Sequence, residues 1–468
     1  MIAFLIAPPT SPHPAGVYPR HPPLLLASCA GALREAGATV HTVDAFAQDL
    51  PIHAVVSQVA LLTPDLVVLL PNDVARETPA AVTAMLAGGL RRKLPEALLV
   101  AAGVGQPHWL AKLLKDVPQL DGAICGDPEE PLVAVHDLLA ENGDWCTVPG
   151  AMTSSTSPVR FAGHICQELD SLPAPAWDLV QLNSYTVLAH RQRGGGEYPI
   201  LASRGCFWDR CGFCQDLACV KSPVYRVRSP ESVVSEMEKA IANFGASHFL
   251  FHDAVFPPRV EWLSRFSGLI IERGLKVTWF CMARADSVSP EGLKLMAQAG
   301  CINICFGLET GSPELLAAMD KGHDLEQSRW AVRQAQLAGL EVSATFILGY
   351  PGETPATARR TVEFAIDLDV DYAQFLLVKW HQVPDHLLDA GTLHEDWELT
   401  QFDYRGMLFV PSRIGTPERL KLLRSYAYLR FYSRPGYLAK QLRKVGGLSD
   451  LRRYVSGAKT LISAMLNR

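Results

Sequence analysis

Short apolar runs alternate with stretches of helical length along the first 145 residues of the chain. The apolar runs cover residues 2–6, 40–43, 66–70, 97–101 and 122–125. Helical patterns cover residues 24–36 and 79–92. Strands that are buried on both faces of a parallel sheet read as short continuous apolar runs. We therefore predict a doubly wound, Rossmann-like α/β domain over residues 1–145, with about five parallel strands.

A doubly wound sheet binds its ligands beyond the carboxyl ends of its strands. The residues that end or follow the predicted strands there are Pro8, Asp44, Asn72, Gly103 and Gly126. We expect them to form the rim of a binding site. The first strand is not followed by the G-x-G-x-x-G pattern that binds dinucleotides, so ordinary NAD binding is not expected.

A second alternation of strands and helices is predicted over residues 197–390, after a linker over residues 146–196 that Trp177 holds in place. Its apolar runs cover residues 198–202, 247–251, 276–281, 302–306, 342–348 and 372–378. Ser-Pro-Glu occurs at residues 229–231, 289–291 and 312–314. This triplet combines an N-cap hydroxyl with a first-turn proline and acid, and so marks helix starts. We predict a (β/α)6-type partial barrel of parallel strands, with functional residues at the carboxyl ends of the strands.

Residues 391–468 are predicted to form a basic helical region. Thr416-Pro417-Glu418 gives another capped helix start. From Arg413 to Arg468 there are thirteen Lys or Arg residues against two acids, although the whole chain has a net charge of -5. This charge serves to balance an acidic body, and a weak contact with an anionic membrane surface is an alternative use for it.

The composition is that of an ordinary globular protein, with 48% hydrophobic and 19% charged residues. No apolar run approaches the roughly 20 residues that a membrane span requires, and the first six residues lack the basic flank of a signal peptide. We therefore expect a cytoplasmic protein with reduced cysteines. We expect it to act on a small molecule and to have no nucleic-acid partner.

Three cysteines lie within nine residues, directly after the first strand of the predicted barrel. They are Cys206, Cys211 and Cys214. Thiolates bind zinc or iron–sulfur clusters. Cys219 would complete four ligands for a structural zinc ion, whereas three ligands with one open position suit an iron–sulfur cluster that must bind something else. Both interpretations remain open at this point.

Further motifs follow in a fixed order, and together with the cysteines they make the chain similar to a known family. They are Ser203-Arg-Gly-Cys206, Cys211-Gly-Phe-Cys214, His252-Asp253, Arg284-Ala-Asp286, Phe306-Gly-Leu-Glu309-Thr-Gly-Ser312, Lys321-Gly322 and Gly349-Tyr-Pro-Gly-Glu353-Thr354. In this order they resemble the radical S-adenosylmethionine (radical SAM) superfamily. The first domain, with Pro22-Pro23-Leu24, Glu35-Ala-Gly37, Val43-Asp44 and Gly126-Asp-Pro-Glu-Glu130, resembles the cobalamin-binding domain that is fused to many of these enzymes.

The resemblance implies a set of cofactors and a role for each motif. Cys206, Cys211 and Cys214 would hold a [4Fe–4S] cluster whose fourth iron binds S-adenosylmethionine, and cleavage of that molecule would give a 5′-deoxyadenosyl radical. The residues implied to bind S-adenosylmethionine are Phe213, Ile347 and Gly349 at the adenine, Glu309 at the ribose, and Asp253 and Arg284 at the methionyl group. For Asp253 and Arg284 a structural salt bridge is the alternative. The five rim residues of the first domain would face cobalamin.

Two departures from the family pattern bear on these assignments. Four residues separate Cys206 from Cys211 where the family has three, which indicates an insertion within residues 207–210 and keeps Cys219 as an alternative ligand to Cys206. The chain also lacks the Asp-x-His-x-x-Gly motif that supplies the lower ligand of cobalamin in mutases. A bound cobalamin would therefore need another lower ligand or none.

Three functions follow from this reading. The leading hypothesis is a cobalamin-dependent radical SAM methyltransferase that acts on an unactivated carbon and receives electrons from a donor such as flavodoxin or ferredoxin. An alternative keeps the radical chemistry without methyl transfer, as in a cyclase, an oxidase or a rearrangement enzyme. A third, from a different class, is a zinc-stabilised binding protein without turnover.

Overall fold

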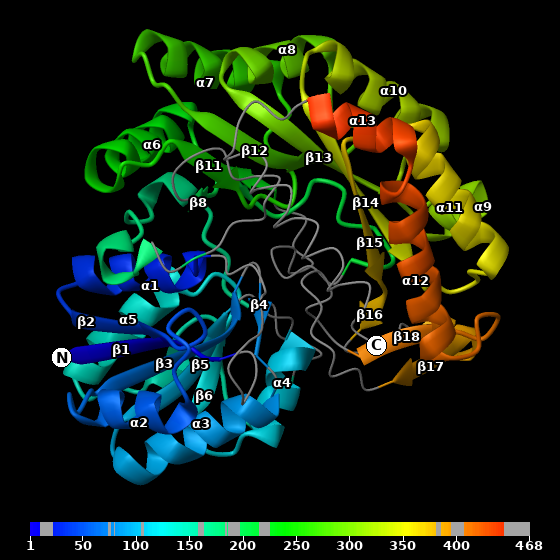
Figure 1. Ribbon diagram of the computed structural model, residues 1–468. Coiled ribbons are helices and arrows are strands. Elements are labelled where there is room, and N and C mark those ends of the chain that lie inside the picture. Colours follow the sequence, from blue (N-terminus) through cyan, green and yellow to red (C-terminus); the bar gives the residue numbers. More distant parts are fainter. Residues whose placement is uncertain are drawn as a thin grey trace. The chain divides into compact units, whose positions relative to one another are not determined.

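The computed structural model describes residues 1–9, 22–73, 76–78, 80–103, 107–157, 163–182, 185, 197–214, 225–380, 385–394 and 407–443. The chain divides into two compact units (Figure 1). The first spans Met1–Thr186, and the second comprises Val187–Gln215 and Pro223–Arg468. Cys219, His381 and residues 444–468 lie outside the described residues.

The first unit is built on a mainly parallel sheet with the strand order β2-β1-β3-β5-β6-β7. Its strands are β1 (Ile2–Ala7), β2 (Thr39–Asp44), β3 (Leu66–Asp73), β4 (Arg76–Glu77), β5 (Leu98–Gly103), β6 (Gly122–Cys125) and β7 (Ala151–Met152). The first five strands in this order pair in parallel, whereas β7 pairs antiparallel with β6, and β4 with β3. This confirms the predicted doubly wound domain. The antiparallel strands β4 and β7 were not predicted.

Helices cover both faces of this sheet. They are α1 (Leu24–Glu35), α2 (Ile52–Ala60), α3 (Ala80–Lys93), α4 (Pro107–Asp116) and α5 (Glu129–Ala140). Figure 1 shows α1 and α5 on one side of the sheet and α2 and α3 on the other. Every residue of α1 from Leu24 to Leu33 is buried, as expected of a helix that is apolar all round.

The described part of the predicted linker packs onto the first unit instead of crossing its surface. The amide of Ala176 donates to the Ala27 carbonyl at 2.8 Å. A Cβ at Gly31 would lie 2.2 Å from the Ala174 carbonyl oxygen, so only glycine lets these two backbones approach. Trp177 is 1% exposed, in agreement with its predicted anchoring role. The linker prediction over residues 146–196 is therefore corrected for this part.

The second unit is built on a six-stranded parallel sheet with the order β15-β14-β13-β12-β11-β8. The strands are β8 (Glu197–Ile200), β11 (His248–Phe251), β12 (Thr278–Ala283), β13 (Cys301–Glu309), β14 (Glu341–Leu348) and β15 (Tyr372–Leu377). Each strand pairs in parallel with the next one in chain order. This is the predicted (β/α)6-type partial barrel.

Helices connect these strands, and the helices that follow Ser229, Ser289 and Ser312 begin where the sequence predicts. They are α6 (Pro230–Phe244), α7 (Val260–Glu272), α8 (Pro290–Gln298), α9 (Pro313–Ala318), α10 (Leu325–Leu337) and α11 (Pro355–Asp367). The hydroxyls of Ser229, Ser289 and Ser312 accept hydrogen bonds from the first-turn amides. The helices form the outer layer of the second unit (Figure 1).

The C-terminal region starts with strands, which the helical prediction lacked. A short antiparallel sheet joins β16 (Lys379–Trp380), β18 (Met407–Pro411) and β17 (Gly391–His394). The helices α12 (Pro417–Tyr432) and α13 (Pro435–Arg443) follow. Tyr428 and Phe431 contact Phe375 of β15, whereas Tyr426 is 40% exposed.

Candidate active site

The cysteine loop begins at the carboxyl end of β8, the first barrel strand. Its start is fixed by β9 (Ser203–Arg204), which pairs antiparallel with β10 (Arg226–Val227). Cys206 and Cys211 are half-buried and Cys214 is exposed, and all three are thiols. The loop therefore presents the three predicted ligands at the barrel end where functional residues gather.

Asp253, which follows β11, anchors the base of this loop. Its carboxylate accepts a 2.5 Å hydrogen bond from Ser203 Oγ and a 3.2 Å bond from the Ala202 amide. The side chain is fully buried, and burial raises the pKa of Asp253 to about 7, although the bonds from Ser203 and Ala202 oppose this rise. The observed contacts position the loop. The expected contact with the methionyl group stays a prediction.

The far end of the loop docks on residues that follow α9. The amide of Gly212 donates to the Met319 carbonyl at 2.9 Å. A Cβ at Gly212 would lie 2.8 Å from the hydroxyl of Tyr350, which itself donates to the Ala318 carbonyl. Glycine is required here because a side chain would push the loop off this support. The motif Cys-Gly-Phe-Cys thus contains two of the predicted ligands and the glycine that lets the loop pack against Met319 and Tyr350.

Phe213 and Ile347, both predicted at the adenine, lie in one hydrophobic cluster. Phe213 is one of the partly buried residues that pack against this group, whose buried members include Leu315, Met319, Ile347 and Tyr350. Gly349 directly follows the strand that contains Ile347 and has a φ of 91°, and its amide donates to the carboxylate of Glu353. The structure therefore brings together the cysteine loop and the residues at the end of β14.

Glu309 forms a buried ion pair at the end of β13. Its Oε1 lies 2.6 Å from Lys321 Nζ, and both residues are less than a tenth exposed. Among the described residues only Oε1 is bonded, so Oε2 stays available as an acceptor. A Cβ at Gly307 would lie 2.5 Å from Glu309 Oε1 and 3.1 Å from Lys321 Nζ. The missing side chain of Gly307 leaves the space that this ion pair occupies.

Lys321 belongs to the Lys321-Gly322 motif, for which the sequence alone predicted no role. Attraction to Glu309 keeps the Lys321 pKa above its usual value, even though burial alone would lower it. Its ammonium also lies 5.4 Å from the centre of the Phe213 ring. The lysine therefore links Glu309, the predicted ribose acceptor, to the cysteine loop. In the sequence, the adjacent Gly322 was the local feature that could have drawn attention to this lysine.

Arg284 reaches the cysteine loop directly. It is 3% exposed, and its Nη1 donates to Cys211 Sγ at 3.8 Å. Burial raises the pKa of the Cys211 thiol to about 11, although the charges of Lys321 and Arg284 oppose this rise. Cysteine must lose its proton to bind a metal. Both cations would assist that loss.

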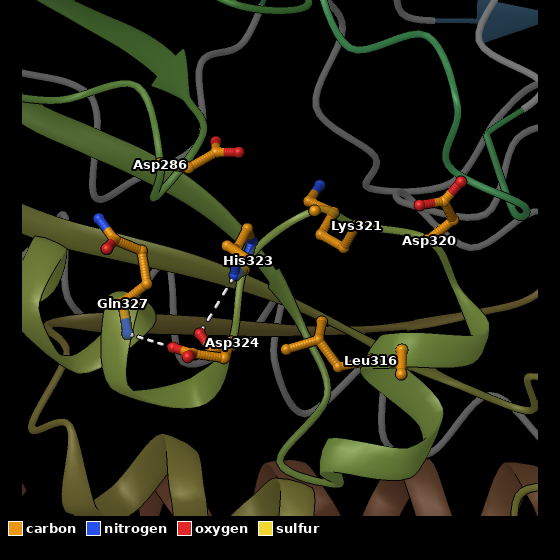
Figure 2. Close-up of a pocket in the computed structure, with 9 residues that line it drawn as sticks. Asp286, Leu316, Asp320, Lys321, His323, Asp324 and Gln327 are labelled. Carbon is orange, nitrogen blue, oxygen red and sulfur yellow. Dashed lines mark hydrogen bonds between the residues drawn. The ribbon is translucent and has the colours of Figure 1, made fainter.

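A pocket of about 590 Å³ opens beside this group of residues. Figure 2 shows the carboxylates of Asp286, Asp320 and Asp324 around it, with Lys321 and His323 among them. Burial lowers the pKa of His323, whose Nδ1 lies 3.3 Å from the Asp324 carbonyl oxygen. The pocket is polar and predominantly acidic.

The predicted rim of the first unit divides into two groups. The carboxylate of Asp44 accepts hydrogen bonds from the Phe46 and Ala47 amides and from the Tyr185 hydroxyl. A Cβ at Gly126 would lie 2.0 Å from the His164 carbonyl oxygen. The protein's own groups therefore fill both of these positions.

The other rim residues lie around the point where the strand order reverses. The order β2-β1-β3 puts this switch point between β1 and β3, and ligands bind at such a point in doubly wound sheets. Pro8 directly follows β1, Asn72 lies in β3, and Gly103 of β5 pairs with Asn72. A ligand role stays a prediction for these three residues.

Residues 200–365 match the family model of the radical SAM superfamily. The match runs from the last residue of β8 into α11, so it contains the cysteine loop and the carboxyl ends of β11, β12, β13 and β14. Residues 200–365 therefore form a radical SAM domain. Such a domain supports an enzyme of the radical SAM class over the alternative of a zinc-stabilised binding protein without turnover. Within the described ranges, no three His, Cys, Asp or Glu side chains gather closely enough to hold a single metal ion.

Curated relatives and a solved structure extend the likeness beyond the radical SAM barrel. An uncharacterized methyltransferase of Pyrococcus horikoshii is 27% identical over 94% of this chain and 95% of its own length. An anaerobic magnesium-protoporphyrin IX monomethyl ester cyclase of Rubrivivax gelatinosus is 24% identical over 93% of this chain and 78% of its own. The radical SAM methyltransferase TsrM of Kitasatospora setae, solved with cobalamin and a [4Fe–4S] cluster, is 18% identical with a TM-score of 0.71 over 99% of each chain. The first unit thus has the fold of a cobalamin-binding-type domain.

Proposed function

We propose that this radical SAM enzyme is a cobalamin-dependent methyltransferase that acts on an unactivated carbon. One observation carries the proposal: the cysteine loop, the Phe213–Ile347 cluster and the Glu309 carboxylate all lie at the carboxyl ends of one parallel sheet. The methyltransferase of Pyrococcus horikoshii, similar over nearly its whole length, supports methyl transfer over the other radical outcomes.

The residues of the loop fit an iron–sulfur cluster. A single zinc ion needs all its ligands within about 2.3 Å of one point, whereas each thiolate of a [4Fe–4S] cluster binds a different iron. Three thiols spaced along one loop, two half-buried and one exposed, suit the wider arrangement. The open fourth position would face solvent or a second ligand.

When bound, the cluster supplies the electron that cleaves S-adenosylmethionine, and cobalamin supplies a carrier for the methyl group. The chain's own residues would bind and orient S-adenosylmethionine. Phe213 and Ile347 offer an apolar surface for the adenine. Glu309 offers Oε2 to the ribose hydroxyls, while Lys321 fixes the orientation of the carboxylate through Oε1. Asp253 holds the loop through Ser203.

Cobalamin would lie at the switch point of the first unit. Pro8, Asn72 and Gly103 are the rim residues that remain for it, because Asp44 and Gly126 are occupied by internal contacts. The tight helix–sheet packing around β1 and β3 supplies a rigid edge for a large planar ligand. Substitution of Gly103 would therefore be expected to disturb corrinoid binding without affecting the barrel.

The alternative is radical chemistry without methyl transfer. The cyclase of Rubrivivax gelatinosus is similar over most of this chain and supports such an outcome. The two functions share the cleavage of S-adenosylmethionine and differ in the second product. S-adenosylhomocysteine forms only when a methyl group is transferred.

Anaerobic reconstitution with iron and sulfide, with and without methylcobalamin, tests the proposal. Mass spectrometry would follow 5′-deoxyadenosine, S-adenosylhomocysteine and bound corrinoid. Cys211→Ala and Cys214→Ala should each abolish 5′-deoxyadenosine formation and the brown colour of the protein. Cys146→Ala, which removes an exposed thiol of the first unit, is the matched control and should change neither. Formation of 5′-deoxyadenosine by the Cys211 or Cys214 variant would refute the cluster assignment.

The partners of the enzyme remain predictions. A low-potential donor such as flavodoxin or ferredoxin would supply the electron, and a cytoplasmic location would suit reduced thiols. In the described part of the chain no helix has the length and apolar character needed to cross a bilayer.

A membrane-surface contact is supported by the two apolar faces of α12. One face is buried in the second unit and contains Leu420, Ala427 and Phe431. The opposite face carries Leu422, Tyr426 and Leu429, which are 66%, 40% and 56% exposed. They are spaced by four and three residues, so they form one stripe. An anionic lipid surface would match both this stripe and the basic charge of the region.

A further inference from the structure

Four residues separate Cys206 from Cys211, one more than in the family pattern. Contacts with the rest of the second unit nevertheless hold this segment in place. Trp208 Nε1 donates to the Asp320 carbonyl at 2.6 Å. A Cβ at Gly322, where φ is +82°, would lie 2.3 Å from the Trp208 ring. Only glycine therefore lets the indole lie in this position, and the hydrogen bond fixes its direction.

The anchored indole supports the guanidinium of Arg284. The guanidinium carbon lies 5.0 Å from the centre of the Trp208 ring and 5.8 Å from that of Phe207. Both rings come from the segment that contains the extra residue. Cation–π contacts of this kind are strongest where the cation is desolvated, and Arg284 is 3% exposed.

The remaining donors of Arg284 are used in fixed directions. Nε and Nη2 donate to the Asp286 carboxylate at 2.9 and 2.6 Å, and Nη2 also donates to the Lys321 carbonyl. This bidentate grip and the aromatic support leave Nη1 facing Cys211 Sγ at 3.8 Å. The guanidinium is therefore held beside the sulfur from three sides, and it cannot rotate away without breaking the Asp286 pair.

We propose that Trp208 and Arg284 form a positioning unit that raises the reduction potential of the cluster on Cys211. When a low-potential donor delivers one electron, the cluster gains one negative charge. A cation and an N–H···S bond at a ligand sulfur stabilise that more negative state, and burial strengthens both effects. The segment with the extra residue carries this indole, which packs against Gly322 and against the guanidinium of Arg284.

This inference rests on the proposed cluster, so the test measures the iron content and the potential separately. Each variant is reconstituted anaerobically, its iron is quantified, and the cluster is titrated with dithionite under electron paramagnetic resonance. Arg284→Gln removes the charge. Trp208→Phe removes the N–H anchor but keeps a ring. Arg210→Gln is the matched control, because Arg210 also lies over the Trp208 ring, at 4.6 Å, but is 63% exposed and pairs with Asp320.

Arg284→Gln should lower the equilibrium constant for reduction at least tenfold, which is about 59 mV for one electron. Trp208→Phe should shift the potential in the same direction by a smaller amount, and Arg210→Gln should leave it unchanged. Full iron content with an unshifted potential in both Arg284→Gln and Trp208→Phe would overturn the inference, as would an equal shift in Arg210→Gln. If Arg284→Gln does not assemble the cluster, the potential measured for Trp208→Phe alone tests the inference. Absence of iron from the unmodified protein would instead refute the proposed function.

Discussion

The buried Glu309–Lys321 pair gives a prediction whose size can be worked from the structure. The two charges are 2.6 Å apart, with side chains 6% and 9% exposed. Breaking a buried pair by removing one partner leaves an uncompensated charge and costs about 3–5 kcal/mol. Lys321→Met should therefore destabilise the barrel by about that amount. The Glu309 carboxylate would stay away from water, because its side chain is only 6% exposed.

A second substitution separates the lost charge pair from lost packing. In Glu309→Gln/Lys321→Met no charge remains buried, so most of the lost stability should return. Arg265→Met is the matched control, since it breaks an ion pair with Glu231 in which both side chains are about half exposed, and it should change stability little.

Hydrogen exchange of the peptides that contain β13 and β14 measures the local opening free energy, which suits a chain of two units better than a global unfolding curve. The raised pKa of Lys321 means that the pair's contribution is complete below the usual lysine pKa and is lost only as pH rises through the raised value. The difference between variants should therefore stay constant from about pH 6 to 9. If Lys321→Met opened as rarely as the unmodified protein, or if the double variant were no more stable than Lys321→Met, the reasoning would be refuted.

Two further predictions concern other parts of the second unit. Burial raises the pKa of Glu353 to about 8, so the folded protein binds a proton that the unfolded chain releases, and this group makes stability fall as pH rises from about 4.5 to 8. Asp253, whose pKa is raised to about 7, adds a fall of the same sign. Glu353→Gln should therefore make the slope of the unfolding midpoints across that range shallower without abolishing it. Leu422→Asp/Leu429→Asp should reduce sedimentation with vesicles of phosphatidylcholine and phosphatidylglycerol by roughly tenfold per leucine. Leu337→Asp, at a leucine of α10 that is 63% exposed, should have no effect, and equal sedimentation of all three proteins would exclude this surface.

The strands and helix starts were predictable because their signals are local. The apolar run at residues 122–125 is β6 itself, and each Ser-Pro-Glu triplet begins a helix whose N-cap bond spans three residues. The sheet of β16, β17 and β18 was missed because its strands are short and because β16 pairs with β18 and not with β17, the next strand in the chain. Met407–Pro411 is an apolar run, so one of these strands did carry a readable signal.

The site residues show the same difference between local signals, which the sequence reveals, and contacts between distant segments, which it does not. Cys206, Cys211 and Cys214 are predicted as ligands from a local motif, whereas the residues that contact their loop come from distant parts of the chain. Arg284 lies 73 residues from Cys211, and Asp253 lies 50 residues from Ser203. Such contacts depend on the register of neighbouring strands, which no local pattern encodes. Asp44 is the opposite case, because its bonds to the next two or three amides are an ordinary turn arrangement.

The four-residue gap between Cys206 and Cys211 shows how a sequence departure can carry structural meaning. A change of one residue in loop length costs little free energy, so the sequence alone indicated a tolerated insertion. In the structure the added segment is held in place by Trp208, whose Nε1 donates to the Asp320 carbonyl at 2.6 Å. Cys206 also interacts with the charge of Arg284, as Cys211 does. Two cysteines that share one buried cation behave as parts of one site. Cys206 as the third ligand, in place of Cys219, stays a prediction.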